Sequence, residues 1–366
     1  MTPANGRGPA TGGRDSATGG RDSATGGRDS ATGGRDSGAA TGGRGPAAGR
    51  WCWTPWAGTT ARPRWWRGRW RRGARTACRS SWSAASRTWP ASWPPATPPS
   101  ELPIVHAPDA VPMAERGAGG PALPGSSLAV GCGLLARGEG AAFVSAGSTG
   151  AVVSQAVRLV GRAEGVLRPA LAIALPALSG GASVLVDAGA TADPTPEMMA
   201  QFALLGAGYA RAVLGVPDPV AGLLSIGSEP GKGNRLARRA EELLRRQPAR
   251  FHGNIEGHDV LSGAVDVIVT DGFTGNVVLK NVEGCVRTAL TMVAQAGLAD
   301  PAALAGVARR YDPQTHGGAA LLGLRGTVVV AHGSSRAATI ARACVVAHAL
   351  SGVRVDAGLA AAPEPA

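Results

Sequence analysis

Four glycine-rich turns, each preceded by apolar residues, are the segments of this 366-residue sequence best suited to chemistry on an anion. Glycine lets the backbone approach a ligand closely, and free N–H groups at the start of a helix attract negative charge. One such turn is ordinary in an α/β protein, but four favour a crevice that binds phosphate. None has P-loop spacing or a clean GxGxxG pattern, so nucleotide binding is not specifically indicated. The turns are residues 145–151, 227–234, 271–276 and 332–335.

The polar side chains in these turns each have a catalytic and a structural interpretation. Lys232 is one of only two lysines; its ammonium group could reach an anion or simply be solvated. The other lysine, Lys280, lies one helical turn after Asn276. It could belong to the site or could equally be a surface residue. His332 ends an apolar strand, where a hydrogen-bonded structural histidine is the commoner outcome. Asp271 could orient a site group or cap the following turn.

The residues around the turns predict a scaffold of alternating strands and helices. Apolar runs of strand length begin at Val184, Val220, Val265 and Thr327, and continuous runs of this kind are typical of parallel strands buried on both faces. Between them, Thr195 can cap a helix whose first residue is a proline. The predicted fold class is α/β, with a doubly wound, Rossmann-like, mostly parallel sheet. The carboxyl edge of that sheet should gather the four turns.

Three further features bear on cell location and metals. The uncharged stretch from Pro169 to Val186 is interrupted by Pro176 and two glycines, so it predicts two buried strands rather than a membrane span. The N-terminus lacks the apolar region of a secretory signal. The five cysteines lie far apart without a CxxC pair, which argues against a zinc site or a disulfide scaffold. The sequence therefore predicts a cytoplasmic protein without a metal.

The composition changes sharply near residue 100. All nine tryptophans lie between Trp51 and Trp93, and residues 1–100 carry the whole net charge of +12. The remainder is neutral, so a nucleic-acid partner for the globular part loses its main support. Residues 10–37 are four copies of the string ATGGRDS, which cannot form a coiled-coil seam. We predict that residues 1–50 are disordered, and the repeat could equally be an artefact of repetitive DNA.

Several segments together resemble the phosphate acyltransferase family of bacterial phospholipid synthesis. Two matches are highly specific: the string DGFTGNVVLK from Asp271 and the pattern F-x-GN-x-EG from Phe251. The matches run in the family's order over about residues 102–350. The others begin at Phe143, Arg168, Asp187, Gln201, Gly222, Lys232, Gly317, Leu321 and Ala331.

The resemblance implies a homodimer related to the phosphotransacetylases and isocitrate-type dehydrogenases, with its α/β domain at residues 101–353 and a disordered tail at 354–366. It implies transfer of a fatty acyl group from acyl carrier protein to inorganic phosphate, without a cofactor. The acyl phosphate would then serve a membrane-bound glycerol-phosphate acyltransferase. Phosphate is already a nucleophile and a thiolate is a fair leaving group. The enzyme therefore needs anion binding and oxyanion stabilisation rather than a strong base.

Site residues follow from the resemblance and this chemistry. Predicted catalytic residues are Lys232, Asn276, His332 and Asp271. Predicted substrate or phosphate contacts are Ser145, Gly147, Ser148, Thr149, Gly150, Asn254, Thr274 and Gly275. The chain has Ser148, Thr191 and Ser225 where the family usually has asparagine, and a hydroxyl has shorter reach and fewer donors. Residues 116–125 also fit the family poorly.

The Trp/Arg-rich residues 51–100 have two interpretations. Tryptophans interleaved with arginines could form an RNA-binding arm, because aromatic rings stack on bases and arginine pairs with phosphate. The genetic code suggests another: the third base of each codon, read with the first two of the next, forces Val, Leu, Asp and Gly at four junctions between Trp51 and Ala57. The other junctions from Arg50 to Arg62 permit the string VVLDAMGGDHGP, which resembles the opening strand and glycine loop of the same family. We hypothesise that this segment is a frame-shifted translation. Without the shift, the domain should lack its first strand and part of its crevice.

Alternative functions remain open at this point. A phosphotransacetylase-like enzyme would use acyl-CoA as the donor, and a chain without the N-terminal glycine loop could be an inactive binding relative. An isocitrate-type dehydrogenase is disfavoured because the metal-binding aspartates are not found. The family associates peripherally with membranes, and the apolar stretch Ala289–Val307 is the predicted contact, although a dimer-interface helix would look the same.

Overall fold

The structure is a computed structural model that describes residues 50–54, 79–84, 104–112, 123–353 and 355. All of these residues fall within one unit, Arg44–Ala366. The repeat at 10–37, most of the Trp/Arg-rich segment and the tail from 356 onward lie outside the described residues. The domain boundary predicted at residue 101 therefore stays a prediction.

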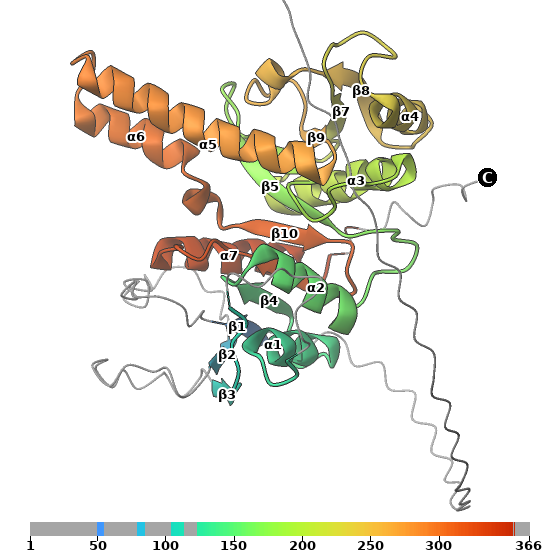
Figure 1. The fold of residues 1–366 in the computed structure, drawn as a ribbon, viewed down its shortest axis with the longest axis vertical. Helices are drawn as coiled ribbons and strands as arrows, with labels where there is room; N and C mark the ends of the chain where they lie inside the picture. Colours follow the sequence, from blue (N-terminus) through green and yellow to red (C-terminus); the bar gives the residue numbers. More distant parts are fainter. Residues whose placement is uncertain (1–49, 55–78, 85–103, 113–122, 354, 356–366) are drawn as a thin grey trace, which may run out of the picture. The chain divides into compact units, whose positions relative to one another are not determined.

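A mixed sheet organises the described part of the chain (Figure 1). The order of its eleven strands is β3-β2-β1-β4-β11-β10-β5-β6-β9-β7-β8. Only the β10–β11, β10–β5 and β5–β6 pairings are antiparallel among these strands. The predicted mostly parallel, doubly wound α/β class is confirmed. The strands are β1 Arg50–Thr54, β2 Arg79–Ala84, β3 Ile104–His106, β4 Ala142–Ser145, β5 Ala170–Pro176, β6 Ala182–Val186, β7 Val220–Leu224, β8 Arg250–Ile255, β9 Val267–Val269, β10 Ala319–Leu322 and β11 Thr327–Val330.

Helices cover both faces of the sheet, and the strand sequences explain why. Successive side chains of a strand point to opposite faces. In β5, Ala170, Ala172 and Ala174 pack with α3, α4 and α7, whereas Leu171, Ile173 and Leu175 pack with α1 and α2. The whole strand is buried, as the uninterrupted apolar run predicts. The α-helices are α1 Ser127–Ala136, α2 Thr149–Leu159, α3 Pro196–Tyr209, α4 Arg235–Leu244, α5 Gly272–Gln295, α6 Pro301–Tyr311 and α7 Ala337–Leu350.

Local predictions around the central strands are confirmed. The stretch from Pro169 to Val186 forms the two buried strands β5 and β6. Thr195 caps α3, its hydroxyl accepting the amide of Met198, and Pro196 is the first residue of the helix. In α3, Phe202, Leu205 and Tyr209 are buried. Within the residues that the structure describes, no helix is both long and apolar enough to cross a membrane.

The position of the first strand departs from one expectation. The sequence as written should leave the domain without that strand, but Arg50–Thr54 forms β1. This strand pairs in parallel with β4 on one side and β2 on the other. The backbone pairing that the fold requires is therefore present. The predicted glycine loop after it lies outside the described residues.

The direction of the strands reverses across the middle of the sheet. Three consecutive antiparallel pairings separate β11 from β6, so β4 and β11 run opposite to β6, β9, β7 and β8. Their carboxyl ends therefore lie on opposite edges. The expectation that all four glycine-rich turns share one edge is wrong, because it assumed a sheet whose strands keep one direction.

Candidate functional site

β4 and β11 are neighbouring parallel strands, so their carboxyl ends lie on the same edge of the sheet. The turns that follow these two strands lie at this edge. Ser145 lies beside Val330 in register, and its carbonyl accepts the amide of Ala331 at 2.8 Å. Ser145 is fully buried, and its hydroxyl accepts the amide of Gly147 at 3.1 Å, which shapes the turn into α2. Thr149 is exposed at the first position of that helix. We call the predicted residues on this edge the β4 group: Ser145, Gly147, Ser148, Thr149, Gly150 and His332.

The two helices that begin at this edge share an unusual start. In the described part of the chain, α1, α3, α4, α5 and α6 each begin with a side-chain oxygen that accepts a backbone amide. Ser148 before α2 and Arg336 before α7 make no such bond. The first amides of a helix have no partner within the helix and carry partial positive charge. Two helix starts without side-chain caps therefore follow neighbouring parallel strands at one edge of the sheet, which is a favourable place for an anion.

His332 lies at the same edge with one ring nitrogen already engaged. The amide of Ser334 donates to Nδ1 at 3.2 Å, and the hydroxyl of Ser334 lies 2.7 Å from the same atom. Because Nδ1 accepts, the neutral ring carries its proton on Nε2 and presents a donor. The hydroxyl oxygen of Ser335, in a residue only 5% exposed, is among the buried polar atoms without a partner in the described structure. Such an atom marks a place where a ligand or water can bind.

The opposite edge holds the other predicted residues, which we call the β9 group: Lys232, Asn254, Asp271, Thr274, Gly275 and Asn276. Asp271 is the N-cap of α5, and its carboxylate accepts the amide of Thr274 at 2.7 Å. Of its two interpretations, the structure thus shows the capping role. Asn276 is exposed one turn into α5. Gly275 is buried so closely that a Cβ atom there would overlap the carbonyl oxygen of Asp187.

The loop that carries Lys232 follows β7 at this edge. Lys232 is exposed, as a lysine that reaches for an anion or for solvent would be. Asn254 on the neighbouring strand β8 donates to the carbonyl of Glu229 at 3.0 Å and so supports the loop. The amide oxygen of Asn254 is buried without a partner in the described structure, as is the hydroxyl of Ser225. The residues of the β9 group therefore lie at the carboxyl ends of the neighbouring strands β8, β7 and β9, on the edge opposite the β4 group of the same chain.

Asp187, at the end of β6, is a residue whose role the sequence did not predict. It is fully buried, and burial raises its pKa although four backbone amides bind the carboxylate and act to lower it. The sequence signal was present: an aspartate directly after a buried strand, followed two residues later by glycine. Its partners are spread over two segments, so its role becomes visible only in the folded chain.

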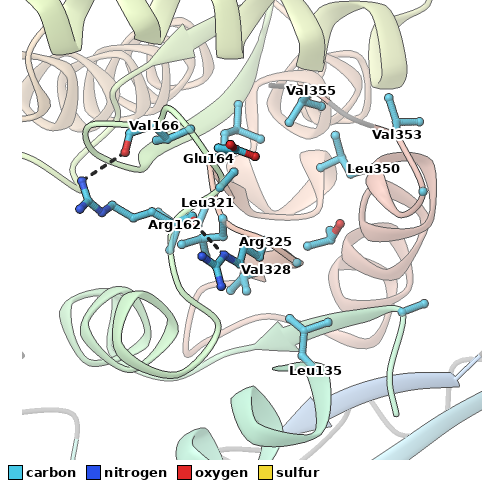
Figure 2. A pocket seen from close by; sticks show the side chains of 18 of the residues that line it. Leu135, Arg162, Glu164, Val166, Leu321, Arg325, Val328, Leu350, Val353 and Val355 are labelled. Carbon is cyan, nitrogen blue, oxygen red and sulfur yellow. Dashed lines mark hydrogen bonds between the residues drawn. The ribbon is translucent and has the colours of Figure 1, made fainter. Parts of the chain in front are cut away.

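The described part of the chain also contains a cavity of about 1260 Å³ (Figure 2). Ala141 and Thr327 line it at the amino ends of β4 and β11, opposite the carboxyl ends that carry the β4 group. Arg162 and Arg325 lie at this cavity, and the guanidinium of Arg325 donates to the carbonyl of Arg162 at 3.1 Å. None of the predicted site residues lines it. Across the described ranges, no cluster of three or more His, Cys, Asp or Glu side chains could hold a metal ion.

Comparisons with known proteins agree with this architecture. A sequence model of the family described as "Fatty acid synthesis protein" matches residues 96–356. A phosphate acyltransferase of Thermobifida fusca is 54% identical over 264 residues, which cover 68% of this chain and 73% of that protein. One from Thermus thermophilus is 43% identical over 273 residues, covering 72% and 82%. A branched-chain phosphotransacylase of Enterococcus faecalis superposes with a TM-score of 0.50 at 12% identity, over 75% of this chain and 90% of that one.

The structural likeness defines the class of fold: an α/β protein built like the phosphotransacylases. The sequence matches define the family. This chain belongs to the phosphate acyltransferase family and is an acyltransferase, as the resemblance in its motifs implied.

Proposed function

We propose that this protein transfers a fatty acyl group from acyl carrier protein to inorganic phosphate and so supplies acyl phosphate for phospholipid synthesis. The observation that carries the proposal is the pair of helix starts at α2 and α7, which lack side-chain caps and follow the neighbouring parallel strands β4 and β11. A phosphate bound there would receive N–H donors from two helices.

The chemistry at this edge requires little more than positioning. A thioester carbonyl beside the bound phosphate would develop negative charge on its oxygen during attack, and donors placed at that oxygen lower the barrier. The Nε2–H of His332 is such a donor, held by the contact of Nδ1 with Ser334. Phosphate attacks the carbonyl carbon, the C–S bond breaks, and the carrier leaves as a thiolate.

A substitution that introduces a carboxylate at the N-cap of α2 tests whether phosphate binds at this site. Ser148→Asp would place a negative charge where phosphate is proposed to bind, whereas Ser148→Ala removes only a hydroxyl that makes no cap bond. We expect Ser148→Asp to lower kcat/KM for phosphate about tenfold or more relative to Ser148→Ala, although aspartate is the better N-cap and should leave α2 at least as stable. Equal kinetics for the two variants would contradict the proposal.

The donor is the main point on which alternatives differ. An enzyme that uses acyl-CoA would have the same anion site, and an inactive relative would bind ligands without turnover. We therefore propose assays of acyl phosphate formation with acyl carrier protein and with CoA as the acyl carrier, at matched chain length. Turnover with the carrier protein supports the proposal, turnover with CoA alone favours the alternative, and binding without turnover favours the inactive relative.

The proposal includes the homodimer, because Lys232 and the β4 group lie on opposite edges of one chain. A second copy could bring its β9 group to the β4 group of the first. Mixing the impaired variants His332→Ala and Lys232→Ala tests this arrangement. If each site takes residues from both copies, the mixture should be more active than either variant alone. Absence of recovery after verified subunit exchange would place each site within one chain.

Peripheral membrane contact is a further part of the proposal. In Figure 1, α5 and α6 lie side by side and project beyond the sheet. Met292 is 64% exposed and Leu298 is 77% exposed, near the ends of these helices that face away from the sheet. Apolar side chains of this kind can enter a lipid interface, where a membrane-bound glycerol-phosphate acyltransferase would collect the product. Flotation with liposomes tests it: protein that stays entirely at the bottom of the gradient would count against membrane contact.

The reading frame of residues 51–100 also belongs to the proposal. Tryptophan has the single codon TGG, so a shifted codon that ends on its first two bases always encodes Leu, Met or Val. Each of the nine tryptophans thus becomes apolar in the shifted frame, which suits parallel strands at the positions of β1 and β2. The family match begins at residue 96, close to where the frame should rejoin. Resequencing the DNA for residues 40–130 tests this: an unshifted frame would favour the inactive relative.

A further inference from the structure

We infer that Asp187 is the positioning residue of the β9 group, acting through the loop at residues 188–191. The carboxylate lies where β6 ends, and the loop wraps around it. The amides of Gly189 and Ala190 donate to Oδ1 at 3.0 and 2.9 Å, and the amide of Thr191 donates to Oδ2 at 2.6 Å. The amide of Leu171, at the start of β5, donates to Oδ1 at 2.8 Å.

The loop in turn holds the start of α5. The carbonyl of Thr191 accepts the amide of Gly272, the first residue of that helix, at 2.9 Å. Two hydrogen bonds therefore connect Oδ2 of Asp187 to the backbone of α5. A Cβ atom at Gly272 would lie 2.7 Å from the same carboxylate oxygen, so the helix begins in direct contact with it.

The contact continues to a predicted site residue. A Cβ atom at Gly189 would lie 3.5 Å from Cβ of Asn276, so the loop also packs beside that side chain. A displaced loop would therefore move both the helix start and Asn276. Small displacements of a positioned group have large kinetic effects, because the reacting geometry is narrow.

Among the residues that the structure describes, the hydrogen-bond donors to the Asp187 carboxylate are all backbone amides. Asparagine has nearly the same shape but replaces one oxygen by an NH₂ group. In Asp187→Asn the three amides at Oδ1 can keep an acceptor, while the amide of Thr191 meets another donor. The substitution therefore perturbs the bond that leads to α5.

The test uses the full chain and rests on the proposed function only for its kinetic part. Asp266→Asn is the matched control, because its carboxylate also accepts a backbone amide, that of Val220 at 2.9 Å, at the opposite end of the β7 strand. At a temperature where both variants are folded, we expect Asp187→Asn to lower kcat for acyl phosphate formation about tenfold to a hundredfold. Asp266→Asn should keep the parent kcat even if it lowers the melting temperature.

Amide hydrogen exchange provides a readout that does not depend on turnover. In Asp187→Asn, exchange should accelerate at residues 188–191 and 272–276 and stay at the parent level elsewhere in the sheet. Parent-like exchange at both segments would overturn the inference, whether or not the parent chain shows activity. An inactive parent would instead count against the proposed function alone.

If Asp187→Asn does not fold, amide exchange in the parent chain still tests the inference. The amides of Gly189, Ala190 and Thr191 should then exchange as slowly as those of the β-strands, because each is bound to a buried carboxylate. Exchange as fast as that of the exposed residues Ser228 and Glu229 would overturn the inference.

Discussion

The carboxylate of Glu241 accepts the amide of Gly231 at 2.9 Å, so a side chain of α4 holds the loop that carries Lys232. The same carboxylate accepts Nη2 of Arg245 at 2.6 Å. Glu241 is 4% exposed, and burial acts to raise its pKa. The Gly231 amide and the Arg245 guanidinium outweigh burial, and the pKa of Glu241 is lowered. The loop therefore depends on an ionised glutamate.

Glu241→Gln should reveal this dependence through pH. A carboxyl whose pKa is lower in the folded state stabilises that state fully above its ordinary pKa of 4.5, and the contribution is lost as pH falls through the lower folded value. We expect the parent to be more stable than Glu241→Gln by about 1–3 kcal/mol near neutral pH. The difference should shrink in acid, as measured by urea unfolding across pH. Glu242→Gln is the control, because its partner Arg239 and Glu242 itself are both exposed; a similar loss there would contradict the prediction.

The two lysines of the chain provide a matched pair. Lys232→Ala removes the cation from the loop held by Glu241, and we expect kcat/KM to fall about tenfold or more, if the ammonium group stabilises the developing charge. Lys280→Ala, further along α5, should leave steady-state kinetics at the parent level. Near-parental kinetics for Lys232→Ala would remove its predicted catalytic role.

Asp271 can be tested for chemistry separately from capping. Asparagine caps helices about as well as aspartate, so Asp271→Asn should keep both stability and activity if the residue only caps α5. Asp271→Ala removes the acceptor for the Thr274 amide and should cost about 1 kcal/mol. Unfolding curves and kinetics on both variants check this. A folded Asp271→Asn with greatly reduced kcat would restore the catalytic interpretation.

Two glycines of α5 should respond oppositely to alanine. Gly275→Ala forces a methyl group against the carbonyl of Asp187, and we expect a loss of about 1–3 kcal/mol. A Cβ atom at Gly284 meets nothing within 4 Å, so Gly284→Ala should stabilise the helix by about 0.5–1 kcal/mol. Chemical denaturation measures both. Equal effects at the two positions would mean that α5 does not pack on Asp187 as described.

The sequence by itself determined the elements and the family. Apolar runs marked strands such as β5 and β11, and Thr195 with Pro196 marked the start of α3, because these signals depend on residues close together in the chain. The glycine-rich strings also supplied the candidate residues of both groups, and the DGFTGNVVLK string pointed to the family that the comparisons confirm.

Only the tertiary structure decided which of those residues meet. The reversal of strand direction arises from pairings such as Ala320 with Ala172, between residues far apart in the chain. No local pattern encodes such a pairing, so the sequence placed Lys232 and His332 together although they lie on opposite edges. The inferred role of Asp187 was hidden for the same reason: it depends on which backbone amides surround the carboxylate, and long-range folding sets that arrangement.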